Sequence, residues 1–178
     1  RHFSHLMAFH PLGLLDPSQG DSVRRILQNS METLERIGPE WWCGYSYSWV
    51  GGMWARMGDG ERAAAALRDF AQCFCLKNSF HANGDQSRSG KSNFTYRPFT
   101  LEGNMAFASS LQEMLLQSHT GTVRIFPAIP PSWKDVSFRT LRTEGAFLVS
   151  AAMRDGKVAE VKVCSTVGGP LRVLNTFS

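Results

Sequence analysis

One acidic residue, Glu102, stands where an aromatic loop gives way to a strongly patterned helix, in the stretch 94–118. A carboxylate in the first turn of a helix is kept ionised by the helix dipole and by the free backbone N–H groups of that turn. Beside Asn104 and the aromatic residues Tyr96 and Phe99, such a carboxylate could act as a general base toward a sugar. The same position also suits an acid that only stabilises the helix, because first-turn acids are common.

Further polar candidates lie before this helix and at the start of the chain. Residues 77–97 lose every regular period and carry His81 among amide and carboxyl side chains, a set able to bind hydroxyl groups. A long irregular loop in a compact domain is usually functional or disordered. Arg1 and His2 are expected to face something polar. His2 and His5 could share a helix face, but no third ligand follows, so we predict neither a metal site nor a cofactor.

The elements that must hold these residues are helices. Apolar residues recur every three or four positions, which predicts helices over 21–37, 45–57 and 61–76, and another that begins at Leu101. Thr100 suits the N-cap of this last helix, and Pro98 prevents an earlier start. Its buried stripe is expected to comprise Leu101, Met105, Ala108, Leu111, Met114 and Leu115.

A dense aromatic cluster occupies the second helix and the residues before it. Five aromatic side chains fall between Trp41 and Trp49, and Trp54 follows. Aromatic side chains can fill a core between helices or form a platform on which a sugar stacks. Both interpretations stay open for Trp49.

After Gly121 the pattern changes to short alternating or β-branched runs. They cover 122–126, 136–141, 145–153, 158–164 and 171–174, and the pairs Asp155-Gly156 and Gly168-Gly169 stand between them as hairpin turns. We therefore expect a mainly α protein with a C-terminal antiparallel β module. Residues 1–120 would form the helical part and residues 121–178 the β domain.

Composition narrows the class of protein. The chain has 178 residues, of which 43% are hydrophobic and 19% charged, enough for a sizeable core. Its net charge of +4 is scattered, so no nucleic-acid partner is expected, and no apolar run is long enough to predict a membrane span. The chain begins with Arg-His rather than Met and carries no signal peptide, which predicts a fragment or a processed piece.

Five short motifs follow one another along the chain. They are RHFSHL at 1–6 with PLG at 11–13, CGYS at 43–46 with WARMGDG at 54–60, FTLEGN at 99–104, EMLLQSH at 113–119, and FPAIP at 126–130 with Trp133 and GAF at 145–147. Together, and in this order, they resemble the characteristic segments of glycoside hydrolase family 95, the family of α-L-fucosidases and related α-L-galactosidases. The resemblance extends through nearly the whole chain.

The resemblance implies the last half of an (α/α)6 toroid, followed by a small β-sandwich-like domain. It also implies an inverting exo-α-glycosidase that acts on α-L-fucosyl or α-L-galactosyl residues of oligosaccharides. In such an enzyme an acid protonates the leaving oxygen, and a base activates water on the opposite face of the sugar. Glu102 would be that base. The substrate-binding candidates are Arg1 and His2, which would contact the glycone, together with Asn104, Trp49 and His81.

Two features separate this chain from the family pattern. Glu102 stands where the pattern has Asp, and the extra methylene matters because a displacement of about 1 Å can lower a rate about 10²-fold. The family's general acid lies upstream of the Arg1-His2 segment. The expected partners are therefore a glycan substrate and the N-terminal remainder of the same protein. A signal peptide in that remainder would make the protein secreted or periplasmic.

Two other functions fit the sequence. One is a non-catalytic carbohydrate-binding or scaffolding relative that retains an aromatic cleft of the toroid. A lyase acting on acidic sugars would need a Tyr or His base, for which Tyr96 and His81 are the candidates.

Overall fold

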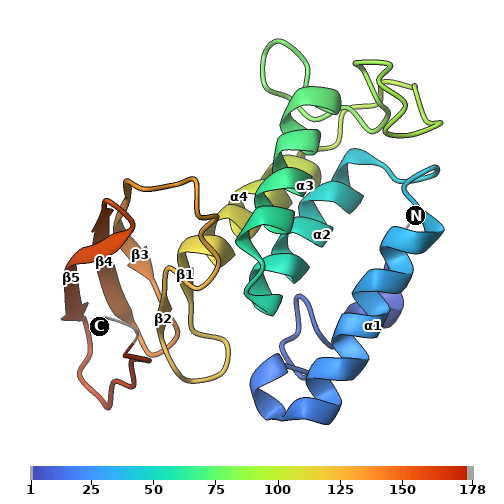
Figure 1. Ribbon diagram of the computed structural model, residues 1–178. Helices are drawn as coiled ribbons and strands as arrows, with labels where there is room; N and C mark the ends of the chain where they lie inside the picture. The colour runs from blue at the N-terminus through green and yellow to red at the C-terminus, as the bar shows by residue number, and fades with distance from the viewer. Residues whose placement is uncertain (1, 176–178) are drawn as a thin grey trace.

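The computed structural model describes residues 2–175, in which a helical part and a β part are joined where α4 runs into β1 (Figure 1). The helical part contains two short 3-10 turns, η1 Ser4–Leu6 and η2 Pro17–Gln19, and the helices α1 Asp21–Ile37, α2 Gly44–Met57, α3 Gly60–Cys73 and α4 Leu101–Leu115. The strands are β1 Leu116–Gln117, β2 Arg124–Ile125, β3 Val136–Arg142, β4 Phe147–Arg154 and β5 Lys157–Ser165. The predicted order of helices followed by antiparallel strands is confirmed.

Helices α2 and α4 pack closely and run parallel. Ser48, in the N-terminal half of α2, contacts α4 at two points: its hydroxyl donates to the Gly103 carbonyl at 3.2 Å, and its carbonyl accepts from the Ser110 hydroxyl at 2.7 Å. Near their C-termini, Gln117 Nε2 donates to the Ala55 carbonyl at 2.9 Å. Because these contacts advance along both helices in the same sense, α2 and α4 begin at the same end of the molecule.

The turn between α2 and α3 reverses the chain. Gly58 ends α2 in the left-handed conformation, with φ +81, a common helix stop that favours glycine. Asp59 then caps α3, because its carboxylate accepts a hydrogen bond from the Arg62 backbone N–H at 2.9 Å. This tight reversal allows α3 to pack against both α2 and α4.

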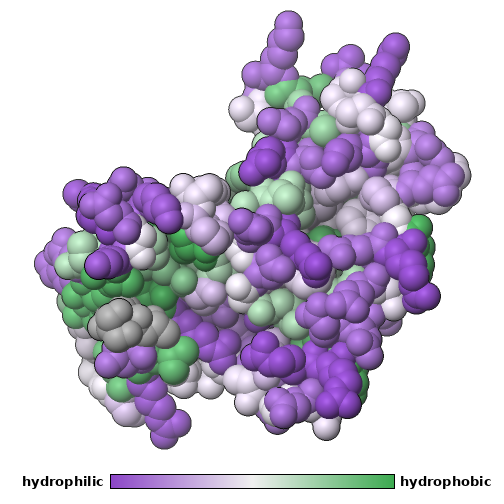
Figure 2. Space-filling model, viewed as in Figure 1, coloured by the Kyte–Doolittle hydropathy of each residue, from purple (hydrophilic) through white to green (hydrophobic). Residues whose placement is uncertain are grey.

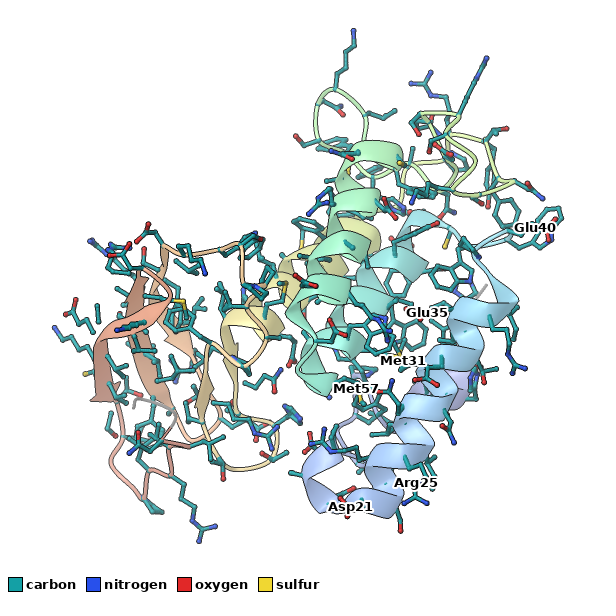
Figure 3. The ribbon with its side chains drawn as sticks, viewed as in Figure 1. Asp21, Arg25, Met31, Glu35, Glu40 and Met57 are labelled. Carbon is teal, nitrogen blue, oxygen red and sulfur yellow. The ribbon has the colours of Figure 1, made fainter. Side chains whose placement is uncertain are left out.

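Helix α1 covers the helical core with one face. Leu27, Met31 and Leu34 are buried, and Figure 3 shows Met31 on the side of α1 that faces the other helices. Ile26 and Ile37 continue the apolar spacing of this helix, but both side chains are exposed. Fewer apolar residues of α1 are therefore buried than the apolar spacing of its sequence suggests.

The buried face of α4 differs from the predicted one. Leu101 and Met105 are 47% and 59% exposed, whereas Gly103, Ser110 and Met114 face the core. Small residues bring α4 close to α2, and the Ser110 hydroxyl finds a carbonyl partner there. The predicted stripe is therefore right toward the C-terminus of α4, where Met114 is buried and Leu111 and Leu115 pack against the cores. It is wrong at Leu101, Met105 and Ala108, because the contact near the start of α4 is made through glycine.

The loop before α4 is ordered by backbone pairing, although it contains no named strand. Ala82 bridges Phe99, Gly84 N–H donates to the Tyr96 carbonyl at 3.0 Å, and Asp85 N–H donates to the Phe94 carbonyl at 2.7 Å. The buried Asp85 carboxylate also accepts hydrogen bonds from the backbone N–H groups of Ser87 and Lys91. Residues 77–97, for which the sequence predicts an irregular loop, thus include backbone pairs that form an antiparallel ribbon leading into α4.

The β part consists of two small antiparallel sheets. One pairs β1 with β2, and the other has the order β3–β4–β5, with the predicted turn at Asp155-Gly156 between β4 and β5. The predicted strand at 171–174 is reduced to a single bridge between Val123 and Val173. A second core lies inside this part and includes Val123, Phe138 and Val149.

The two parts present different surfaces. Figure 2 shows apolar residues gathered over the β part, where Val167, Leu171 and Leu174 are exposed, and mainly hydrophilic residues over the loops above the helices. Among residues 2–175, no helix is both long and apolar enough to cross a membrane.

Candidate functional site

Glu102 projects from the first turn of α4, at the end of the molecule where α2 also begins, and its side chain is exposed. The first backbone N–H groups of a helix have no partners within the helix, so this end favours negative charge. Thr100 is the N-cap residue, as predicted, but its hydroxyl makes no cap hydrogen bond to α4. It lies instead 2.7 Å from Nδ1 of His81.

His81 lies inside the helical part, with no exposed surface. Its Nδ1 is 2.8 Å from the Thr100 carbonyl oxygen, and because a carbonyl only accepts, Nδ1 carries the proton. Its Nε2 has no hydrogen-bond partner among the described atoms. Burial lowers the pKa of His81, and it outweighs the Thr100 hydrogen bond and the negative charge of Glu102, which act in the opposite direction.

Asn104 uses its amide to hold the loop that carries His81. Its Oδ1 accepts a hydrogen bond from the His81 backbone N–H at 2.9 Å, and its Nδ2 donates to the Ser79 carbonyl at 2.9 Å. Both ends of the amide are therefore engaged by backbone groups within the protein.

Trp49 lies in the helical core and is only 7% exposed. Its indole N–H donates to the His10 carbonyl at 2.9 Å, and its ring is 5.5 Å from the Phe3 ring and 5.8 Å from the Tyr45 ring, between centroids. This placement favours the core interpretation over a sugar-stacking platform.

Tyr45, which was not among the candidates predicted from the sequence, is close enough to Glu102 for the charge of that carboxylate to act on its hydroxyl. Burial raises the pKa of its hydroxyl, and the charges of Cys43 and Glu102 raise it further. Tyr45 is in the first turn of α2 and Glu102 is in the first turn of α4, so only the pairing of these helices brings them together. No local signal in the sequence could have found this neighbour.

The N-terminal candidates are anchored through Phe3. Arg1 lies outside the described residues, and His2 is exposed. The ring of Phe3 is 5.1 Å from Trp42 and 5.5 Å from Trp49, between centroids. Since Trp49 also contacts Tyr45, the start of the chain packs near the N-terminal half of α2, toward the end that presents Glu102.

Two separate groups of buried charged residues lie nearer the other end of α2, and sequence reasoning did not predict either of them. Arg56 forms a two-point salt bridge with Glu113, at 2.9 and 3.3 Å. Asp16 lies 2.8 Å from His119 and 3.3 Å from Arg124. These pairs connect segments far apart in the chain.

A pocket of about 760 Å³ lies toward the end of α2 opposite to Glu102. It is lined by the first turns of α1, including Asp21 and Arg24, and by the α2–α3 turn at Met57 and Asp59. Figure 3 labels Asp21 and Met57 around this lower region. Among residues 2–175, no group of three or more His, Cys, Asp or Glu side chains could hold a metal ion.

Comparisons with known proteins agree along the chain. The family model described as "Glycosyl hydrolase family 95 catalytic domain" matches residues 1–115, and the one described as "Glycoside hydrolase family 95, C-terminal domain" matches residues 117–176. The chain is also similar to Alpha-L-fucosidase 2 of Arabidopsis thaliana, with 26% identity over 162 residues. That match covers 90% of this chain but only 18% of the relative's length.

Proposed function

The chain belongs to glycoside hydrolase family 95, and from this premise we propose that it is part of an inverting exo-α-glycosidase that acts on α-L-fucosyl or related α-L-galactosyl residues of oligosaccharides. Glu102 is its general base. The observation that carries the proposal is the position of this carboxylate, which is exposed in the first turn of α4, at the end of the molecule where α2 also begins.

The rest of the catalytic machinery is assigned to other parts of the protein. An inverting enzyme needs a second carboxyl group about 6.5–9.5 Å from the base, with the attacking water between them. We assign this general acid to residues that precede residue 1. Arg1 and His2 contact the glycone, and the packing of Phe3 near the N-terminal half of α2 supports that assignment. Asn104, Trp49 and His81 support the site without contacting the sugar. The Asn104 amide and the Trp49 indole N–H are bonded to backbone groups of the protein, and His81 has no exposed surface.

The helical part is the last half of an (α/α)6 toroid in this proposal. Two observations support it: α2 and α4 run parallel as inner helices would, and α1 and α3 alternate with them along the chain. The exposed Leu101 and Met105 on α4 are then the surface on which the remainder of the catalytic domain packs. The relative's much greater length supports the existence of such a remainder.

The test is Glu102→Gln in the intact protein, with every residue that its reading frame adds before residue 1 or after residue 178. General base catalysis contributes about 10²–10⁴-fold, so kcat on an α-L-fucosyl oligosaccharide should fall by at least about 10²-fold. Calorimetric titration with the same glycan should show binding retained, because the substitution removes a charge and little volume. Inversion is checked by proton NMR, in which the β anomer of the released sugar should form first.

Two results would contradict the proposal. Unchanged hydrolysis by Glu102→Gln would remove Glu102 from the mechanism. An intact wild-type protein that binds the glycan but does not cleave it would favour the non-catalytic carbohydrate-binding relative. A matched control is Glu113→Gln on the same helix, which should lower stability through its Arg56 contact and leave kcat within about threefold of wild type.

A further inference from the structure

We propose that His81 is the positioning residue for Glu102: its imidazole lies as a wedge between the N-termini of α2 and α4 and fixes the first turn from which the Glu102 carboxylate projects. The inference rests on the proposed function, in which Glu102 is the general base. His81 touches no substrate, and it acts through Thr100 and the backbone of α4.

The wedge is a close steric fit. A Cβ built on Gly44 would lie 2.2 Å from Nε2 of His81, and a Cβ built on Gly103 would lie 2.2 Å from Nδ1. Both distances are shorter than any real contact, so each helix can approach the ring only because it carries glycine there. On a third side, Phe70 of α3 packs against the imidazole, with 5.2 Å between ring centroids. The ring therefore sets the spacing between the two helix ends.

Hydrogen bonds from the His81 ring connect it to the residue that precedes α4. Nδ1–H reaches both the carbonyl and the hydroxyl oxygen of Thr100, at 2.8 and 2.7 Å. The Thr100 carbonyl also accepts the Gly103 N–H at 3.3 Å, so it belongs to the first turn of α4. Glu102 lies between these two residues in the chain. The imidazole thus holds the short stretch of backbone that carries the base.

The backbone of the loop makes this contact reciprocal. Asn104 accepts the His81 backbone N–H, and the His81 carbonyl accepts the Thr100 N–H at 3.4 Å. The first turn of α4 therefore holds His81 from both sides while His81 holds Thr100. Closed arrangements of this kind keep a catalytic side chain within a fraction of an ångström of its working position.

The unpartnered Nε2 is the observation that a purely structural role leaves unexplained. A buried nitrogen without a partner is unfavourable, and an apolar ring of similar size would avoid that penalty. What an apolar ring lacks is the Nδ1–H donor to Thr100. We therefore infer that histidine is needed at position 81 for its Nδ1–H donor, which is directed at Thr100 in front of the helix turn that carries the base.

The test compares three substitutions at His81 in the intact protein, each measured for kcat and KM. His81→Asn keeps an N–H donor near the position of Nδ1, His81→Gln moves its amide toward Nε2, and His81→Phe keeps the ring without a donor. Since misplacement by about 1 Å can lower a rate about 10²-fold, His81→Phe and His81→Gln should lower kcat about 10- to 100-fold. KM should stay within about threefold, and His81→Asn should recover about tenfold in kcat over His81→Gln.

A spectroscopic readout accompanies the kinetics. In nitrogen-15 NMR of the wild-type histidines, Nδ1 of His81 should resonate as a protonated nitrogen and Nε2 as an unprotonated one. The control is Leu27→Ala, a buried substitution on α1 that lowers the melting temperature and should leave kcat within about twofold.

The outcomes separate this inference from the proposed function. If Glu102→Gln abolishes turnover while His81→Phe and His81→Gln keep wild-type kcat, His81 does not position the base and the inference is overturned alone. A proton on Nε2 rather than Nδ1 also overturns it. If Glu102→Gln keeps turnover, the proposed function fails and the inference fails with it. If His81→Phe does not fold, the comparison of His81→Asn with His81→Gln decides the question.

Discussion

The two glycines beside His81 are the single residues on which the geometry of the candidate site depends most directly. Gly44 begins α2 and Gly103 lies in the first turn of α4, and neither has a left-handed backbone that would itself require glycine. Their role is to leave space for the imidazole ring. A substitution at either position therefore reports on the wedge rather than on backbone strain.

Gly103→Ala should destabilise the protein by about 1–3 kcal/mol, because the new Cβ would overlap the His81 ring. The sign of this change in unfolding free energy is informative, because a glycine-to-alanine substitution in an unobstructed helix stabilises the helix by up to about 1 kcal/mol. Urea unfolding of the chain measures the difference. Adding His81→Ala should remove the overlap and make the effect of Gly103→Ala smaller, and an increase in stability from Gly103→Ala alone would contradict the wedge.

His10 is a second buried histidine with a consequence for pH. Burial, and then the positive charges of Arg56 and His119, lower its pKa from 6.5 to about 3. Between these two pH values the unfolded chain binds a proton at His10 that the folded protein does not bind. The free energy of unfolding therefore has its full value, as far as His10 is concerned, above pH 6.5, and it decreases as the pH drops toward 3.

His10→Gln should therefore flatten the dependence of unfolding free energy on pH within that window, at some loss of stability near neutral pH. Urea unfolding at several pH values across the window measures the slope. His5→Gln, at an exposed position, is the matched control and should leave the slope as in the wild type. An unchanged slope in His10→Gln would show that other groups carry the pH dependence.

At the scale of elements, the contact between α2 and α4 is held by small residues around Ser48 and by a buried ion pair toward the C-termini of both helices. Arg56 binds Glu113 of α4 and also donates to the Phe9 carbonyl at 2.9 Å, so it joins α4 to the segment before α1 as well. The side chains of Arg56 and Glu113 are only 5% and 16% exposed. Removing one partner would leave the other charge buried without compensation.

Arg56→Met should lower the free energy of unfolding by about 3–5 kcal/mol, because Glu113 then remains as an unpaired buried charge. The double variant Arg56→Met, Glu113→Leu should be more stable than Arg56→Met alone, since no charge is left in the contact. Chemical denaturation of the two single variants and the double variant gives the coupling between them. Strictly additive losses would contradict a direct interaction across α2 and α4.

At the scale of the whole molecule, the helical part meets the β part through Asp16. Its carboxylate contacts His119, after α4, and Arg124 of β2, although Asp16 itself precedes α1. Burial alone would raise the pKa of Asp16, but hydrogen bonds from His119, Ser18 and Arg124 lower it well below its ordinary value. The ionised Asp16 carboxylate therefore stabilises the folded protein fully above the ordinary pKa of 3.8, and this stabilisation is lost as the pH falls below that value.

Asp16→Asn should weaken the junction by about 1.5–3 kcal/mol, the usual range for hydrogen bonds to a charged group. The two parts contain separate hydrophobic cores, so loosening their junction should also separate their unfolding. Differential scanning calorimetry should then show a broadened or double transition, with faster protease cleavage between residues 115 and 124. A single transition as sharp as the wild type's would show that the junction does not depend on Asp16.

The sequence by itself determined most of the elements and the family. Gly38-Pro39 ends α1, Gly58 ends α2 and Asp155-Gly156 turns β4 into β5, because each signal acts within a few residues. The order of motifs along the chain was enough to assign glycoside hydrolase family 95, which the family models confirm. The sequence also pointed to Glu102 as a candidate general base, and this catalytic role stays a prediction.

Only the tertiary structure decided which faces are buried and which residues surround Glu102. Apolar spacing placed Leu101 and Met105 in the buried stripe of α4 together with Met114, but of these only Met114 is buried, and the contact with α2 is made through Gly103 and Ser110. The reason is that close helix contacts select small residues and polar partners from distant parts of the chain, which periodicity cannot register. His81 became a buried wedge for the same reason, since its neighbours come from α2, α3 and α4 and meet only when these helices pack.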